Sequence, residues 1–333
     1  MANEVEKYNL LALADIEKIN GFDDDDIEKL NGFEFTGATL LKGIFGFGRE
    51  IHPGDVTAIS SLVSDVGVIA SDTAAVGTVR EILAAADYGT GTAIFGFGSN
   101  YPNKYGITNL VNTSGVVASD TAAVASAKDG PAGCEYGTGL AIFAYGNISG
   151  YTSVSNLVNS SGVVASDVTG VGTARETIVG ASYGGDKGIF GLGFTNVDPY
   201  YQGMTNLVSN SGVVAYDTTA VATARYAACA AEYGTDKAIF DKGHGAGGAA
   251  GPHVSNLISN SGVVASDVTG VGTIRSYIAA TKYGSGKAIE AFGEAASGTV
   301  SLSNLISDLG VVASDTAGVG TERKRCAAAS FGT

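Results

Sequence analysis

A basic side chain follows an aspartate by eight residues at regular intervals along this chain, and such pairs could transfer protons or bind each other. Five pairs combine Asp with Arg: Asp72 and Arg80, Asp167 and Arg175, Asp217 and Arg225, Asp267 and Arg275, and Asp315 and Arg323. The remaining pair is Asp120 with Lys128. Because equivalent copies suit a structural bond better than one active centre, the pattern predicts charge-assisted hydrogen bonds between neighbouring repeats.

Residue types that bind metals or act as nucleophiles are few and scattered. The three cysteines, Cys134, Cys229 and Cys326, fit neither a disulfide framework nor a zinc motif, which predicts buried thiols and a reducing compartment. His244 and His253 could contribute to a metal site, but no ligand spacing supports one. There is no nucleophile elbow, no phosphate-binding loop and no unrepeated carboxylate pair in an apolar setting. The sequence thus predicts no cofactor, no metal and no catalytic residue.

The composition limits the classes of function. The chain has 333 residues, of which 45% are hydrophobic, and it carries a net charge of −14. It can bury a sizeable core, and such an acidic surface repels the phosphates of nucleic acid. The N-terminus lacks the basic and apolar regions of a secretory signal, and no apolar run approaches the ~20 residues of a membrane span. We therefore expect no nucleic-acid partner and no membrane insertion.

Six copies of one pattern occupy about residues 38–333. Between the repeated aspartates, the spacings are 48, 47, 50, 50 and 48 residues. Each copy contains an Ile-containing run that ends near Gly, an NLV-like run, a Gly-containing turn, a VVASD-like run and a run rich in small residues. Short apolar runs separated by turn residues predict four strands per copy and no helix.

The strands are apolar on successive residues, so each sheet is expected to be buried between neighbours. Six such sheets predict an all-β fold, a six-bladed β-propeller of four-stranded antiparallel blades, with Ala-rich strands crowded around the axis. The repeats begin with a second strand at residues 40–48 and end with a first strand at 324–332. Pairing of these segments would close a propeller of residues 37–333 and remove its open edges. An open solenoid is the alternative.

The order of runs in each copy resembles the kelch repeat, which also has an Arg before its inner strand and an Ile/Phe strand ending in Gly. The paired glycines and the tryptophan of that family are missing, since the chain has no Trp. The segments GTAIFGFG and NSGVVASDVTGVGT more closely resemble repeat proteins encoded by bacteriophages and other viruses of aquatic microbes. This resemblance implies a virion or tail-associated protein that is made in the host cytoplasm.

Residues 1–36 stand outside the repeats. The motif DIEKINGF at residues 15–22 recurs as DIEKLNGF at 26–33, and the pair is similar to short repeats in phage structural proteins. We predict a docking segment that binds other virion or scaffold proteins, or alternatively a solvated acidic tail. The apolar residues expected to dock are Ile16, Ile19, Phe22, Ile27, Leu30 and Phe33.

The copies differ most in the segments that follow the Ile/Phe strand. These segments share one phase of the repeat, so we expect them on one face, where loops on a rigid scaffold commonly bind partners. Their tyrosines offer flat amphipathic surfaces to a sugar or a protein: Tyr101, Tyr105, Tyr151, Tyr200 and Tyr201. Ordinary exposed loops without a ligand are the alternative.

Together these patterns predict a non-enzymatic structural or interaction protein, a tail or capsid-surface component of a virion that displays a propeller to a host-surface glycan or protein. One alternative is a kelch-like interaction or surface-assembly scaffold of cellular origin. Another is a propeller hydrolase or lyase that acts on polysaccharide. The enzyme would need charged residues that converge on the central channel, where we place Glu81, Glu135, Glu176, Glu232 and Lys324.

Overall fold

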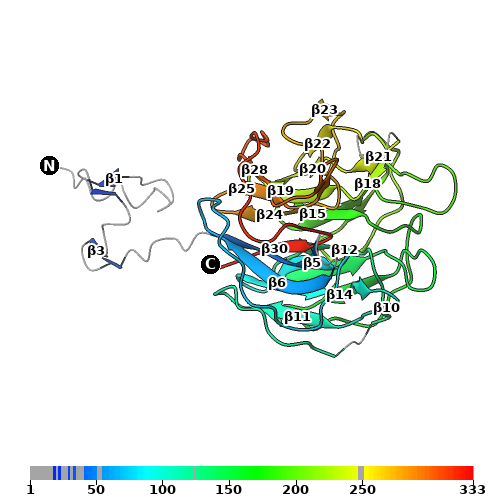
Figure 1. Ribbon diagram of the computed structural model, residues 1–333, viewed down its shortest axis with the longest axis horizontal. Helices are drawn as coiled ribbons and strands as arrows, with labels where there is room; N and C mark the ends of the chain where they lie inside the picture. Colours follow the sequence, from blue (N-terminus) through cyan, green and yellow to red (C-terminus); the bar gives the residue numbers. More distant parts are fainter. Residues whose placement is uncertain are drawn as a thin grey trace. The chain divides into compact units, whose positions relative to one another are not determined.

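The computed structural model (Figure 1) describes four short strands before residue 41 and then residues 41–50, 55–122, 125–246 and 251–332. The chain divides into two compact units, Met1–Leu40 with Thr333, and Leu41–Gly332. The expected all-β class is confirmed, because the described residues form strands, bridges and turns without a helix. None of the described segments is a helix of the length and apolarity that would cross a membrane.

In the N-terminal unit, each copy of the duplicated motif forms one antiparallel pair of very short strands. The pairs are β1 (Lys18–Ile19) with β2 (Phe22–Asp23), and β3 (Lys29–Leu30) with β4 (Phe33–Glu34). Ile16 and Ile27 lie outside the described residues. The docking role of this unit stays a prediction.

Six antiparallel sheets form the larger unit, and we number them by their second strands. The first strands are β30 (Ala327–Phe331), β7 (Ala84–Tyr88), β12 (Ala132–Tyr136), β15 (Val179–Tyr183), β19 (Cys229–Tyr233) and β24 (Ala279–Tyr283). The second strands are β5 (Lys42–Glu50), β8 (Thr92–Gly96), β13 (Leu140–Ala144), β16 (Lys187–Gly191), β20 (Lys237–Asp241) and β25 (Lys287–Ala291). The third strands are β6 (Val56–Val63), β11 (Thr108–Val111), β14 (Ser155–Val158), β17 (Thr205–Val208), β22 (Val254–Ile258) and β28 (Ser303–Ile306).

Shorter strands border these sheets. They are β9 (Ser99–Asn100) with β10 (Asn103–Lys104), β18 (Arg225–Tyr226) with β21 (His244–Gly245), β26 (Glu294–Ala295) with β27 (Gly298–Thr299), β29 (Arg323–Lys324) beside β5, and β23 (Val268–Thr269) beside β22. The second strands are almost wholly buried, whereas the first strands alternate buried with partly buried residues.

The prediction of four full strands per sheet is wrong for most repeats. The VVASD-like segment touches the third strand only through single bridges, as at Val111 with Val117, and β23 in sheet 5 is the exception among the described sheets. A side chain also takes part in the bonding between these two segments. Asn109 Nδ2 donates to Ala118 O (2.9 Å) and to Asp120 Oδ1 (2.9 Å), so it bonds where backbone pairing would continue.

The two ends of the larger unit belong to one sheet. The C-terminal strand β30 pairs with β5 from Ala327 opposite Gly46 to Phe331 opposite Lys42, and the two strands lie side by side in Figure 1. The short strand β29 pairs with the end of β5. Sheet 1 is therefore made from both ends of the repeated region, which leaves neither end as a bare edge.

A circle of hydrogen bonds joins the sheets where their first strands begin. Each residue of the circle donates its N–H to the carbonyl of its equivalent in the preceding sheet, at 2.7–3.2 Å. The residues are Ile82, Gly130, Thr177, Ala227, Tyr277 and Arg325. The circle closes because Ile82 N–H donates to Arg325 O at 3.0 Å. All six residues have φ between 51° and 65°, a backbone conformation that is strained for residues other than Gly. The hydrogen bonds of the circle stabilise this conformation.

A second circle joins the sheets where their first strands end. A Gly after each first strand donates to the turn of the next sheet, at 2.7–3.0 Å. The donors are Gly89, Gly137, Gly184, Gly234, Gly284 and Gly332. Gly284 donates to Leu41 O and Gly332 to Gly91 O, so sheet 6 meets sheet 1 as the other sheets meet each other.

Aromatic contacts fill most junctions between sheets. Edge-to-face ring pairs with centroids 5.2–5.7 Å apart occur at Phe47–Phe95, Phe97–Phe143, Tyr145–Phe190 and Phe292–Phe45. Such pairs add to the free energy gained from apolar burial. Each second strand thus contributes to the core on both of its sides.

Candidate functional site

The repeated arginines form a buried framework between the sheets. Arg80 is fully buried and donates to Phe97 O (2.7 Å) and Thr78 O (3.0 Å). It also donates to Asn109 Oδ1 (2.6 Å), and its guanidinium lies 4.1 Å from the ring centroid of Phe47 in the preceding sheet. Burial lowers the pKa of Arg80 to about 10, so this side chain stays charged at neutral pH.

Each framework Arg or Lys bonds with the aspartate of its own sheet, not with the aspartate eight residues before it, which lies in the preceding sheet. Arg80 Nη1 lies 4.0 Å from Asp120 Oδ1, and Arg323 Nη1 lies 3.1 Å from Asp72 Oδ1. The reason is that the chain enters the next sheet between the aspartate and the basic residue. Other links run Arg175–Asp217 directly, and through asparagines as Lys128–Asn156–Asp167, Arg225–Asn256–Asp267 and Arg275–Asn304–Asp315.

Side chains differ from sheet to sheet at the end where the first strands begin. The residue after each framework Arg or Lys varies, with five residue types in six sheets: Glu81, Asp129, Glu176, Tyr226, Ser276 and Lys324. Their backbones pair with residues after the second strands, or at the end of β5 in sheet 1: Ser99, Asn147, Phe194, His244, Glu294 and Arg49. No pair occurs twice, although the backbone around it repeats. We call these residues, with the first circle of hydrogen bonds, the mouth.

Aromatic side chains from sheets 3 to 6 form a continuous arc at the mouth. The aromatic arc consists of Tyr151, Phe194, Tyr200, Tyr201, Tyr226 and Tyr277. The ring centroids of Phe194 and Tyr226 are 5.3 Å apart, and Tyr201 stacks on Tyr226 at 5.6 Å. Tyr226 meets Tyr277 edge-on at 6.1 Å. The rings are partly buried and Tyr200 is 50% exposed, so the arc presents aromatic surface to solvent.

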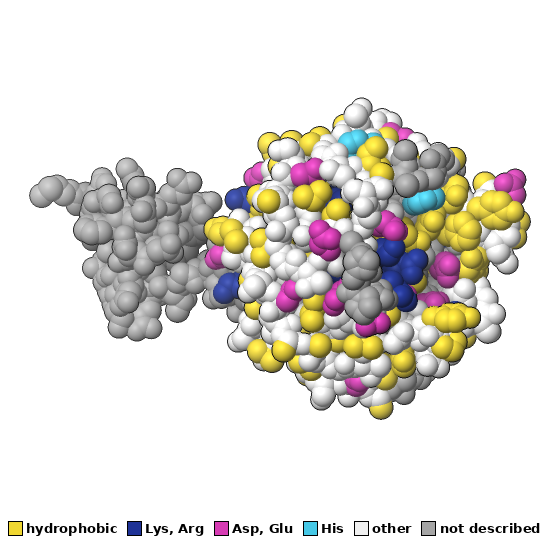
Figure 2. Space-filling view, in the orientation of Figure 1, with side chains coloured by type: hydrophobic (Ala, Val, Ile, Leu, Met, Phe, Trp, Pro, Cys, Tyr) yellow, Lys and Arg dark blue, Asp and Glu magenta, His cyan; other side chains and the backbone are white. Residues whose placement is uncertain are grey.

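Charged side chains adjoin the arc on its sheet 1 side. Arg49 Nε donates to Glu81 Oε2 (2.8 Å), and Arg325 Nη1 donates to the same oxygen (3.2 Å). The Arg325 guanidinium lies 4.6 Å from the ring centroid of Tyr277. Lys324 Nζ donates to Glu294 Oε1 (2.6 Å). Figure 2 shows Lys and Arg side chains gathered beside hydrophobic ones on the visible face.

Two carboxylates of the mouth have pKa values displaced in opposite directions. Burial raises the pKa of Glu176, and the nearby Asp129 carboxylate raises it further. Burial alone would also raise the pKa of Glu81, but the hydrogen bonds and charges of Arg49 and Arg325 lower it below its ordinary value. Glu81 is thus a fixed anion, whereas Glu176 takes up a proton more easily.

The structure brings together three of the five tyrosines predicted to bind a ligand. Tyr151, Tyr200 and Tyr201 belong to the aromatic arc. Tyr101 is 88% exposed and, with Tyr105, makes none of the ring contacts of the arc. The prediction missed Phe194, Tyr226, Tyr277, Arg325 and most of the mouth, although variation beside the repeated Arg or Lys was a visible signal.

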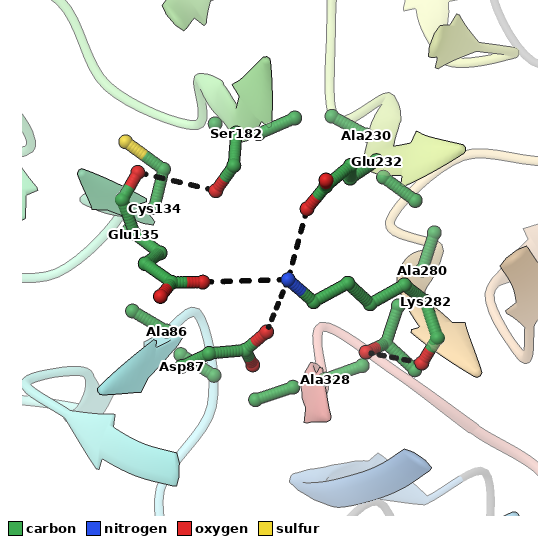
Figure 3. A pocket seen from close by; sticks show the side chains of 17 residues that line it. Ala86, Asp87, Cys134, Glu135, Ser182, Ala230, Glu232, Ala280, Lys282 and Ala328 are labelled. Carbon is green, nitrogen blue, oxygen red and sulfur yellow. Dashed lines mark hydrogen bonds and ion pairs between the residues drawn. The ribbon is translucent and has the colours of Figure 1, made fainter. Parts of the chain in front are cut away.

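Acidic side chains also converge in a cavity that is lined by residues of the six first strands (Figure 3). Lys282 Nζ lies 2.8 Å from Glu232 Oε2. It lies 3.3 Å from both Asp87 Oδ2 and Glu135 Oε2. A convergent acidic cluster would favour an enzyme, but here the ammonium group occupies the centre of the cluster. The cavity of about 60 Å³ admits a few waters and no sugar ring. The cluster therefore acts as an internal ion pair network.

Replacing Lys282 with Met should destabilise the protein by about 2 kcal/mol at neutral pH, because the carboxylates then repel each other without a counter-ion. Burial already raises the pKa of Glu135 above 4.5, and loss of the ammonium raises it further. The folded state of the variant then binds more protons than the unfolded state, so its stability falls as pH rises from about 4.5 through the raised pKa.

Urea unfolding of wild type and Lys282→Met at pH 5 and pH 8 measures this effect. The exposed Lys287 on β25 offers a matched control, and Lys287→Met should match wild type at both values. An equal stability difference for Lys282→Met at pH 5 and pH 8 would show that the three carboxylates do not feel the ammonium.

A second, wholly buried charge cluster lies between sheets 5 and 6, and it corrects the expectation of no unrepeated carboxylate pair in an apolar setting. Lys242 Nζ contacts Asp241 Oδ2 (3.0 Å) and Glu290, and all three side chains are fully buried. Arg275 Nη2 lies 3.3 Å from Glu290 Oε1, and Cys229 Sγ donates to Glu290 Oε2 at 3.0 Å. Because solvent does not reach these side chains, we interpret the cluster as structural.

Within the described residues, no three or more His, Cys, Asp or Glu side chains are grouped to hold a metal ion. His244 instead packs 5.0 Å from the Tyr226 ring. A comparison with models of known protein families finds no match, and a comparison with curated proteins finds none.

Proposed function

We propose that the six sheets are blades of a closed β-propeller, and that the chain is a non-enzymatic interaction protein that presents its mouth to a partner surface. The two closed circles of hydrogen bonds and the pairing of β30 with β5 support the closed form. One contrast supports this function. The buried framework repeats in all six sheets, whereas each sheet contributes a different residue pair to the mouth. Sites that vary on a rigid scaffold suit recognition.

We further propose that the protein is a tail or capsid-surface component of a virion. The resemblance of its repeats to virus-encoded repeat proteins supports this setting. So does the duplicated motif of residues 15–33, whose copies form equal strand pairs separate from the larger unit. Residues 1–36 would dock on another virion or scaffold protein, and the mouth would bind a host-surface glycan or protein.

Removing residues 1–36 should abolish incorporation into particles and leave the thermal unfolding of the remaining chain unchanged, because Leu41–Gly332 forms a compact unit by itself. Quantitative mass spectrometry of purified particles measures incorporation. A control variant, Tyr216→Ala, changes an 82% exposed residue of the repeats and should be incorporated normally. Normal incorporation of the truncated chain contradicts the docking role, and absence of the full chain from particles favours a cellular scaffold.

One observation favours a second candidate, a hydrolase or lyase acting on polysaccharide. Acid–base pairs in active sites often have pKa values displaced in opposite directions, as Glu176 and Glu81 do here. If the mouth cleaves polysaccharide, the wild-type chain releases shorter products from an oligosaccharide panel and Glu176→Gln releases none. No products from the wild type, by mass spectrometry after long incubation, exclude this candidate.

A further inference from the structure

The mouth has an uneven distribution of side chains that narrows the choice of ligand. Aromatic residues occupy its sheet 3 to sheet 6 side, and the arc ends at Tyr277, where Arg325 lies against the ring. Arg325 and Glu81 are hydrogen-bonded at the end of the arc. A ligand that covers the arc therefore meets an aromatic surface first and a donor and acceptor beside it.

The charges around the arc show no surplus of cations. Arg49 and Arg325 bind Glu81, and two further pairs, Lys324 with Glu294 and Lys104 with Asp129, lie at 2.6 Å and 3.0 Å. With Glu176, the described mouth and its neighbour Lys104 thus hold four cations and four carboxylates. Because the whole chain carries −14, an acidic ligand gains no net attraction here.

The mixture of hydrogen-bond donors and acceptors at the mouth suits a ligand that carries hydroxyl groups. Arginine only donates hydrogen bonds and an ionised carboxylate only accepts them, whereas a sugar hydroxyl does both. A neutral sugar can therefore bond to Arg325 and to Glu81 while its apolar face covers an aromatic ring.

The size of the channel limits how such a ligand lies. The cavity below the mouth, lined by Tyr277, Thr177 and Arg325 among others, measures about 70 Å³. That space holds a few waters but no sugar ring. The ligand must therefore lie across the mouth, as part of a longer chain, rather than enter the channel end-on.

We propose that the mouth binds a neutral oligosaccharide, laid across Tyr226 and Tyr277 with hydroxyls bonded to Arg325 and Glu81. This inference rests on the proposed function, since it names the ligand class of the same surface. It differs from the sequence prediction in its place: Tyr101 and Tyr105 take no part.

The test measures binding of the full chain to immobilised neutral gluco-, galacto- and manno-oligosaccharides and to sialylated, uronate-containing and sulfated ones. We expect binding to at least one neutral class, changed less than twofold between 50 and 500 mM NaCl. Tyr226→Ala and Tyr277→Ala should each weaken it at least tenfold, as aromatic anchors of interfaces do. Tyr277→Phe, which keeps the ring, should retain most of the affinity, and Tyr216→Ala should equal wild type.

Four outcomes overturn the inference. Preference for acidic glycans, or a steep loss of affinity with salt, overturns the ligand class. Wild-type affinity of both Ala variants, with folding checked by circular dichroism, overturns the site. Attachment of the chain to host cells without binding any glycan overturns the inference and leaves the proposed function standing. Binding to neither glycans nor host cells defeats the proposed function as well.

Discussion

Replacing Arg323 with Met is expected to lower the free energy of unfolding by about 3–5 kcal/mol, because a buried charge network loses its cation. Arg323 is fully buried where sheet 6 meets sheet 1. It contacts Asp72 at 3.1 Å, donates to Ser61 Oγ at 2.9 Å and lies 3.8 Å from the Phe292 ring centroid. If the two ends of the repeats are joined in solution, this junction contributes as much to the free energy of unfolding as a junction between two sheets that follow each other in the chain.

The loss of stability at an equivalent junction between consecutive sheets provides the reference for this prediction. Arg175 occupies the equivalent place between sheets 3 and 4, 4.4 Å from the Tyr145 ring centroid, so Arg175→Met should cost a similar amount. Arg175→Lys is the matched control and should cost about 1 kcal/mol. A lysine, Lys128, already occupies the equivalent position between sheets 2 and 3. Urea unfolding followed by circular dichroism measures all three. A loss for Arg323→Met below one third of that for Arg175→Met contradicts closure.

Lys242→Met should also cost about 3–5 kcal/mol, because it leaves two buried carboxylates to a single cation. Lys242 contacts both Asp241 and Glu290, and Arg275 is the other cation within reach of Glu290. All four side chains are fully buried. Neither carboxylate can reach solvent without disturbing the packing between sheets 5 and 6.

A compensated variant should reverse that loss. Positions 242 and 290 correspond to the ring pairs of other junctions, such as Phe97 with Phe143. At the place equivalent to Asp241 stands Gly96, where an added Cβ would come within 3.2 Å of the Phe143 ring. The triple variant D241G/K242F/E290F should therefore be at least as stable as wild type, since apolar replacement of buried ion pairs is neutral or stabilising by about 1–4 kcal/mol. A triple variant as unstable as Lys242→Met contradicts this.

The same cluster predicts a pH dependence. Burial, with the neighbouring Glu290, raises the pKa of Asp241 from 3.8 to about 7. The folded state then holds a proton that the unfolded state releases, so this group stabilises the fold below pH 3.8 and its contribution is lost as pH rises to about 7. Urea unfolding from pH 5 to pH 8 should show this decline in wild type. If the triple variant shows the same decline of stability with pH, a group other than Asp241 causes it.

Several features of the fold could be predicted from the sequence because they depend on local patterns. Apolar runs between turn residues predicted the strands, and their order placed residues 324–332 beside 40–48. The count of four full strands was wrong because most VVASD-like segments meet the third strand only through single bridges, with side chains such as Asn109 bonding beside them. Spacing alone does not reveal that an amide will compete with the backbone.

The candidate site was only partly predictable. The loop tyrosines Tyr151, Tyr200 and Tyr201 were found because they lie in segments that visibly differ between copies. Tyr226 and Tyr277 were missed because they lie just after the repeated arginines, outside the segments from which the prediction was made, although the copies differ there as well. Glu290 looked like a decayed copy of Phe, and only its contact with Lys242 shows that the two changes compensate each other.

By itself, the sequence determined the number of repeats, the strand order within each and the complementarity of the two ends, since each of these follows from the order of short segments in the repeated pattern. Only the tertiary structure decided which charges meet: Arg323 with Asp72, and Lys282 with carboxylates from three other sheets. The physical reason is that these partners come from segments that are far apart in the chain. Their distance depends on how six sheets pack together, and no local spacing records it.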